Sequence, residues 1–224
     1  MNDAHHKVPT LSPLELRVLG VLVEKSLTTP DYYPLTLNAL LAGCNQKTSR
    51  NPVMSATEAE IQMALDGLKR HTLVIESFGA SGRVMRYAHN ATKVLGVHQA
   101  QIALLTAMML RGPLTPGELR VNCERMYSFP DLSSVEAYLD ELQERYGMVA
   151  KLPRQPGSRE QRYAHLLGGP VDAEAAEAGH VIAEGGVTTV EVAALKGQVA
   201  ALQDEVAELR ALVERLYAEL GVSR

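Results

Sequence analysis

Cationic side chains gather at three places in this sequence: the segment 45–51 and two stretches, 83–86 and 154–162, that we predict to lie in β-hairpins. Arginine and lysine in loops and hairpins neutralise phosphates, and nearby hydroxyl and amide groups add hydrogen bonds to a backbone or a base edge. The alternative is that they are solvated loop charges. The candidate nucleic-acid contacts are Lys47, Ser49, Arg50, Asn51, Arg83, Arg86, Arg154, Arg159 and Arg162.

Residues of the kinds that act in catalysis or hold metals are scattered. His5 and His6 lie in a polar tail, where a stray pair is commoner than a metal site. His89 and His165 end equivalent predicted strands, which favours a repeated structural role over catalysis. The sequence has no glycine-rich phosphate loop and no paired-carboxylate motif. We therefore expect no enzymatic activity, no catalytic or metal-binding residue and no cofactor.

An internal repeat positions these candidates. Each copy opens with an apolar helix, over 13–25 and 97–110. A second helix follows, opened by Pro34 and closed by Gly43 in the first copy. In the second copy Thr115, Pro116 and Glu118 form an N-terminal capping box. The third helices are predicted to start with boxes of their own, over 55–58 and 133–136.

Both third helices lead into a predicted hairpin, with strands 73–78 and 83–89 in the first copy and 148–152 and 161–166 in the second. Both hairpins end in Arg-Tyr-Ala-His. Three helices followed by two strands is the order of a winged helix, whose second and third helices form a helix-turn-helix. Apolar spacing predicts a core containing Leu16, Leu19, Leu22, Ile61, Leu65, Ile102, Leu105, Val135 and Leu139.

The C-terminal part carries a different pattern. Residues 168–190 are rich in Gly, Ala and Glu and predict a flexible linker. Valine and leucine then alternate at heptad positions, which predicts a parallel two-stranded coiled coil over 191–221. Glu191 would face Lys196 and Glu205 would face Arg210 across a dimer, although the helix could also pack on its own chain. The predicted seam is Val192, Leu195, Val199, Leu202, Val206, Leu209, Val213, Leu216 and Leu220.

The fold class is therefore α+β and predominantly helical. We predict a disordered tail over 1–10, winged-helix domains over 11–92 and 93–167, the linker, and the coiled coil. Apolar runs are shorter than a membrane span, and the N-terminus lacks a signal-peptide core. The two cysteines, Cys44 and Cys123, lie in different predicted domains, which disfavours a disulfide or zinc site. We expect a cytoplasmic protein without membrane contact.

Charge argues against a strong nucleic-acid binder. The chain has 22 Lys and Arg against 26 Asp and Glu, a net charge of −4. Residues 1–168 hold 18 against 16, a balance of +2, and residues 169–224 hold 4 against 10, a balance of −6. The third helices, whose N-terminal residues would read bases, carry Glu58, Glu60, Asp131 and Glu136. Part of this acidity complements helix dipoles, but it makes the second copy a poor DNA reader.

Several motifs resemble a known family. The stretches LSPLELRVLGVLVEKS, TTPDYYPLTLNALLAGCNQKTSRNPVM, RGPLTPGELR and RQPGSREQRYAHLL resemble the YceH-like family of uncharacterised bacterial proteins, over roughly residues 10–167. The resemblance implies tandem winged helices and carries over no catalytic or metal residue. It implies no established biochemical role.

Two functions follow as expectations. The first is a regulatory, DNA-associated protein that grips duplex DNA through its hairpins and the segment 45–51, and dimerises through the coiled coil. The alternative is an adaptor that binds other proteins. At the level of fold, tandem winged helices with acidic faces resemble those of chromosome-segregation scaffolds, which bind proteins. A contiguous basic face joining Lys47, Arg50 and Arg83 would favour DNA, and scattered cations would favour the adaptor.

Overall fold

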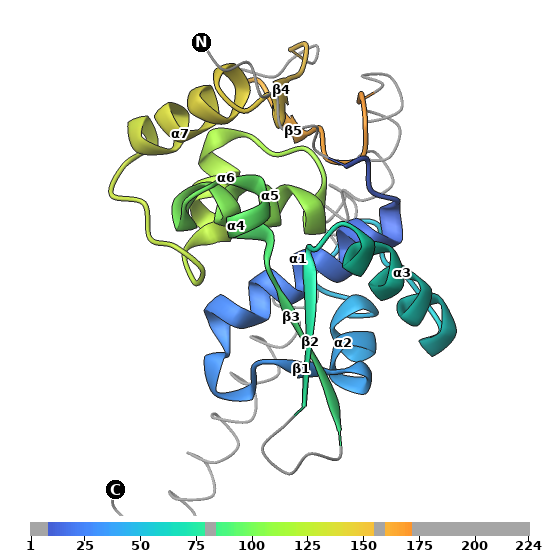
Figure 1. Ribbon diagram of the computed structural model, residues 1–224. Helices are drawn as coiled ribbons and strands as arrows, with labels where there is room; N and C mark the ends of the chain where they lie inside the picture. The colour runs from blue at the N-terminus through green and yellow to red at the C-terminus, as the bar shows by residue number, and fades with distance from the viewer. Residues whose placement is uncertain (1–8, 79–83, 155–159, 172–224) are drawn as a thin grey trace, which may run out of the picture. The chain divides into compact units, whose positions relative to one another are not determined.

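The computed structural model describes residues 9–78, 84–154 and 160–171, and the rest of the chain is drawn as a grey trace in Figure 1. The described residues form a mixed α/β structure with seven α-helices and two small antiparallel sheets. The predicted tail up to residue 8, the linker from residue 172 and the coiled coil lie outside them, as do Arg83 and Arg159.

The first repeat begins with α1 (Pro13–Thr28), which opens with a capping box between Ser12 and Glu15. A short 3₁₀ turn (Pro30–Tyr32) and β1 (Leu35–Thr36) lead to α2 (Leu37–Cys44) and α3 (Glu58–Arg70). The strands β2 (Val74–Phe78) and β3 (Met85–His89) complete the unit. β1 and β2 both pair antiparallel with β3, so the strand order is β1-β3-β2 and β2 is an edge strand (Figure 1).

The second repeat follows the same order. After the short α4 (Ala91–Leu95) come α5 (Gln99–Arg111), α6 (Pro116–Cys123) and α7 (Leu132–Glu144), then the hairpin of β4 (Val149–Lys151) and β5 (Tyr163–His165). An isolated bridge joins Leu114 to Tyr163, just as Leu35 of β1 pairs with Tyr87 of β3. The predicted order of three helices and a hairpin in each copy is confirmed. The sequence did not predict β1 or α4.

Several predicted helix starts were wrong. The capping box of α3 pairs Thr57 with Glu60, two residues after the predicted one. In α7 the cap is Asp131, whose carboxylate accepts from the Ser134 amide at 2.7 Å. A carboxylate or hydroxyl two residues away competes for the same role, and local sequence does not decide between them. The predicted box of α6, between Thr115 and Glu118, is confirmed.

The start of α2 also differs from the prediction. Pro34 follows a cis peptide bond and lies before β1, so it does not open the helix. Thr36 is the cap instead, with its hydroxyl accepting from the Ala39 amide at 3.3 Å. Thr36 and Thr115 are therefore equivalent caps, and Cys44 and Cys123 equivalent last residues, of α2 and α6.

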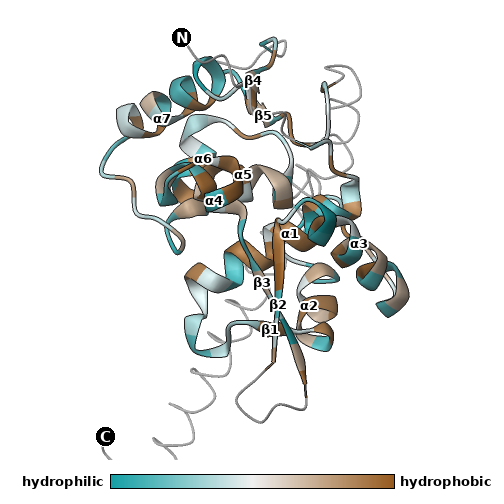
Figure 2. Cartoon of the chain, in the orientation of Figure 1, coloured by the Kyte–Doolittle hydropathy of each residue, from teal (hydrophilic) through white to brown (hydrophobic). Residues whose placement is uncertain are grey.

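Both repeats contribute to one continuous hydrophobic core, which contains every residue predicted to be buried. α5 is buried over residues 100–110 and is mainly hydrophobic (Figure 2). It packs against α1, which is itself buried over residues 16–23. The two helices approach closely at Gly20, where an added Cβ would lie 2.9 Å from Leu110 Cδ2.

Candidate functional site

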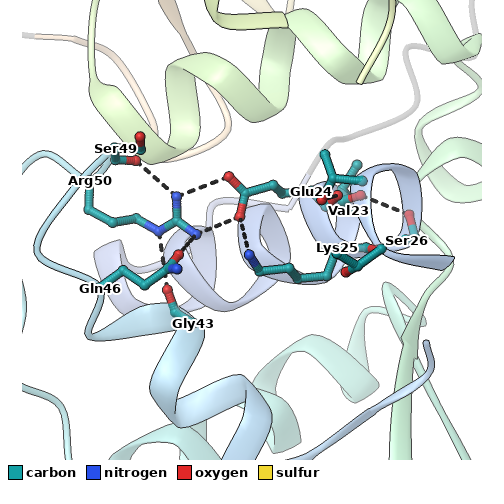
Figure 3. Close-up of polar contacts among 10 residues, drawn as sticks. Val23, Glu24, Lys25, Ser26, Gly43, Gln46, Ser49 and Arg50 are labelled. Carbon is teal, nitrogen blue, oxygen red and sulfur yellow. Dashed lines mark hydrogen bonds and ion pairs between the residues drawn. The ribbon is translucent and has the colours of Figure 1, made fainter. Parts of the chain in front are cut away.

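The guanidinium of Arg50 is buried and fully engaged inside the first repeat. It forms a two-pronged ion pair with Glu24 on α1, with contacts of 3.1 and 2.5 Å. Its other hydrogen bonds go to the carbonyl oxygens of Gly43 (3.1 Å) and Ser49 (2.9 Å) and to the Gln46 side chain (2.7 Å) (Figure 3). The side chain has no exposed surface. Arg50 therefore joins α1, the end of α2 and the segment 45–51.

Arg17 reinforces the same place from α1. Its residue is 1% exposed, and it donates to the carbonyl oxygens of Cys44 (3.1 Å) and Pro52 (2.6 Å). These two carbonyls flank the segment 45–51. Burial and the nearby charge of Arg50 lower the pKa of the Arg17 guanidinium. Two buried cations therefore hold both ends of the segment.

Asn51 fastens the segment to the second repeat. Its amide donates to the carbonyl oxygen of Leu110 at 2.8 Å, and its side chain donates to that of Arg111 at 3.3 Å. The last carbonyls of a helix lack partners within the helix, so Asn51 caps the C-terminal end of α5. Asn45 and Ala56 close the base of the segment with two hydrogen bonds of 2.8 Å each.

Only two of the four candidate phosphate contacts in the segment 45–51 are free to meet a ligand. Lys47 and Ser49 are exposed, but Arg50 and Asn51 are occupied by protein groups. The Arg50 guanidinium makes five protein contacts and has no free donor facing solvent, which weakens its predicted role as a phosphate contact. The sequence did not predict the structural role of Arg50, because an arginine in a polar segment gives no signal of its long-range partner on α1.

Two arginines of the hairpins also form hydrogen bonds within the protein. Arg86 donates to the carbonyl oxygen of Pro34 at 2.8 Å, and Arg162 donates to that of Pro113 at 3.0 Å and forms an ion pair with Glu118. The two bonds are equivalent, because each arginine begins an Arg-Tyr-Ala-His motif. Pro34 directly precedes Leu35 of β1, and Pro113 directly precedes Leu114, which pairs with Tyr163 as Leu35 pairs with Tyr87. Arg154 is exposed. Of the three cations whose contiguity would favour DNA, Lys47 is exposed, Arg50 is buried and Arg83 lies outside the described residues.

The surface formed by α3 and β2 is acidic and apolar instead. Glu58 and Glu60 are exposed at the start of α3. Lys69 is held by Asp66 at 2.8 Å and by Glu76 of β2 at 2.6 Å, and these partners raise its pKa. Among the apolar residues, Met63 on α3 is 65% exposed and Phe78 on β2 is 69% exposed. We call this surface, formed by residues 58–70 and 74–78, the α3–β2 face.

The sequence did not predict the exposure of these apolar residues. The one available signal is that Met63 lies off the buried row of Ile61, Leu65 and Leu68 on α3. The charged residues at exposed positions of α7 in the second repeat are all acidic: Glu136, Asp140 and Glu144. Neither third helix therefore presents a basic surface to a phosphate backbone.

The cysteines are buried, and the paired histidines are half-buried. Burial raises the pKa of Cys44 and of Cys123 to about 12 each, which keeps both thiols protonated. Burial lowers the pKa of His89, and lowers that of His165 to about 4. His89 Nε2 contacts the Ser26 hydroxyl at 3.0 Å, and its amide donates to the Tyr33 hydroxyl at 2.5 Å. Within the described residues, no group of three His, Cys, Asp or Glu could hold a metal.

Comparisons with known proteins give a family without an assigned role. Residues 11–158 match the model described as protein of unknown function, DUF480. A UPF0502 protein of Burkholderia pseudomallei is 54% identical over 214 residues, covering 95% of this chain and 90% of the relative. UPF0502 proteins of Burkholderia thailandensis (53% over 217 residues, 96% and 92%) and Leptothrix cholodnii (51% over 216 residues, 95% and 96%) are similar over nearly their full lengths.

The ion pair between Arg50 and Glu24 makes a prediction about stability. Replacing Arg50 by Met leaves the Glu24 carboxylate, whose side chain is only 16% exposed, without its guanidinium partner, so the free energy of unfolding should fall by about 3 kcal/mol at neutral pH. The double variant Arg50→Met with Glu24→Leu should recover much of this loss. Arg125→Met, at an exposed position, is the control and should change stability by less than about 0.5 kcal/mol. Urea unfolding followed by circular dichroism measures all three.

The pH dependence of the stability of these variants distinguishes the contribution of charge from that of packing. Burial alone would raise the pKa of Glu24, but hydrogen bonds and the charge of Arg50 outweigh it and lower that pKa. The contribution of the ion pair to the free energy of unfolding is therefore fully present above about pH 4.3, the pKa of a glutamate in the unfolded chain. It is lost as the pH falls through the lower pKa that Glu24 has in the folded protein. The difference in free energy of unfolding between wild type and Arg50→Met should decrease below about pH 4. A difference that stays constant down to acid unfolding would refute the ion-pair account.

Proposed function

The chain belongs to the DUF480 family, whose uncharacterised bacterial members are called UPF0502 proteins, and we propose that it is a non-enzymatic adaptor that binds another protein through its α3–β2 face. The proposal takes each repeat as a winged helix. The order of helix, strand, two helices and hairpin, with β1 and β2 flanking β3, supports that assignment. The described helices include none long and apolar enough to cross a membrane. A cytoplasmic location stays a prediction.

The observation that carries the proposal is the character of the α3–β2 face. In a DNA-binding winged helix, the third helix enters the major groove and cations contact the phosphates. Here α3 carries exposed Glu58, Glu60 and Met63, and the neighbouring β2 carries exposed Phe78. Exposed apolar residues rimmed by polar ones are typical of protein-interaction surfaces.

DNA association remains the second candidate because some cations are free to serve it. Lys47 and Arg154 are exposed, and Arg83 and Arg159 lie outside the described residues. The internal bonds of Arg50, Arg86 and Arg162 weaken this alternative, since they remove cations from the predicted contact set. We therefore rank the adaptor first.

A photoreactive amino acid in place of Met63 tests the choice between protein and DNA. Met63 is 65% exposed on the α3–β2 face, so a bound partner should lie within reach of the probe. Irradiation of cells that make the chain should give an adduct that survives nuclease and is degraded by protease. The same probe at Val121, which is 76% exposed on α6, is the control and should give little of that adduct. A nuclease-sensitive adduct at position 63 would assign the face to DNA.

We also propose that the chain is a homodimer through the predicted coiled coil of residues 191–221. Two protomers would present two α3–β2 faces, and linked binding sites raise the effective concentration of a second contact. Light scattering on the intact chain should give the mass of a dimer. Replacing Leu202 and Leu209 by Lys should give a folded monomer, because the cations would lie in the dimer seam. A monomeric mass for the unmodified chain across micromolar concentrations would contradict this.

A further inference from the structure

The edge of β2 offers backbone hydrogen-bonding groups that β3 does not use. The Asn90 amide donates to the Leu73 carbonyl at 2.7 Å, and this bond sets the alternation along the hairpin. The backbone N–H and C=O groups of Ile75 and Ser77 then point toward β3, and those of Glu76 and Phe78 point away from it. β1 lies on the other side of β3, so no strand of the described sheet covers this edge.

The second repeat provides an internal comparison, because its hairpin has the same register. Glu76 lies opposite Tyr87, and Lys151 lies opposite the equivalent Tyr163. Two residues further on, the position of Phe78 corresponds to Pro153. Lysine and proline are the residues by which natural proteins block pairing at an edge strand, since proline has no N–H to donate. The second repeat therefore has a blocked edge where the first has an open one.

The side chains at the open edge suit an added strand. Ile75 and Phe78 lie on opposite faces of β2 and are 50% and 69% exposed, so a strand beside them would cover apolar surface on both faces. Strand addition of this kind obtains affinity from main-chain hydrogen bonds and selectivity from the alternating side chains.

We propose that β2 accepts an extended, basic segment of a partner protein as a fourth strand of the sheet. This rests on the proposed adaptor function and specifies how the α3–β2 face binds. The partner strand would pair with the backbone of Glu76 and Phe78, place apolar side chains beside Ile75 and Phe78, and place a lysine or arginine opposite Glu76.

Charge favours a basic partner over a second copy of this chain. Asp66 and Glu76 share the single ammonium of Lys69, and Glu58 and Glu60 add further negative charge along α3. If two copies of β2 paired antiparallel about their centres, Glu76 would lie opposite Glu76. Like charges at directly opposed positions destabilise a pair of strands. A cation at that position of the partner removes the repulsion.

A labelled peptide of valines with a single central lysine tests the proposal, because it can place lysine opposite Glu76 and valine beside both Ile75 and Phe78. Its fluorescence anisotropy should rise on titration with the intact chain, and the backbone amide resonances of Glu76 and Phe78 should shift. Two matched peptides should not bind: one N-methylated at alternate amides, which cannot pair with an edge, and one with glutamate in place of lysine. An absence of binding by the valine–lysine peptide at millimolar concentration would overturn the proposal.

Two variants introduce into β2 the residue types that block the edge of β4 in the second repeat. Phe78→Pro removes one outward N–H without touching the bonds to β3, and Glu76→Lys reverses the local charge. Each should weaken peptide binding by about tenfold or more, with an unchanged circular dichroism spectrum. Phe78→Leu keeps the N–H, and Glu136→Lys makes the same charge change on α7, so both should bind as wild type does. Equal binding by Phe78→Pro and wild type would overturn strand addition.

The photoreactive probe at position 63 separates this proposal from the adaptor function. Combining it with Phe78→Pro should abolish the protein adduct if the partner binds as a strand. A protein adduct that persists in the Phe78→Pro background would refute strand addition and leave the adaptor function standing. A nuclease-sensitive adduct would refute both.

Discussion

The two-pronged ion pair between Arg50 and Glu24 is the constraint on which much of the first repeat depends. The five donors of the buried Arg50 guanidinium are all satisfied, and their partners fix the end of α2, the segment 45–51 and Glu24 of α1 in one arrangement. Arg17 fixes the flanks of the same segment, so the two arginines act together. Once the segment is held in this way, Asn51 can cap the last carbonyls of α5, and the two repeats are joined by polar contacts as well as by their shared core.

The same constraint changes what the molecule can bind. Cations that the sequence placed in a phosphate-binding set are used to build the fold, since Arg50, Arg86 and Arg162 all donate to protein oxygens. The surface that we propose for a partner is that of α3 and β2, which carries exposed Glu58, Glu60, Met63 and Phe78. The two repeats share the framework bonds of the hairpin and differ at its edge, with Glu76 and Phe78 in one and Lys151 and Pro153 in the other.

The sequence predicted what depends on local pattern. The spacing of Ile61 and Leu65 or Val135 and Leu139 identifies the buried side of a helix, and the Arg-Tyr-Ala-His motifs identified equivalent strands. It failed where several residues could serve one local role, as with Ser55 and Thr57 before α3. It also failed where the partner is remote: nothing near Arg50 indicates Glu24, and nothing near Asn51 indicates Leu110. Exposure of Phe78 depends on where the sheet ends, which strand propensity does not reveal.

The amide hydrogen exchange of Asn51 tests most directly the claim that the segment 45–51 belongs to the framework. An amide that donates to the end of a buried helix opens only when a large part of the structure unfolds. We expect the Asn51 amide to exchange about as slowly as amides in the middle of α5, and the amides of the exposed residues Lys47 and Thr48 to exchange much faster. Exchange of Asn51 at the rate of a solvent-exposed loop would mean that the segment is not held by α5, and would contradict a framework role for Arg50 and its neighbours.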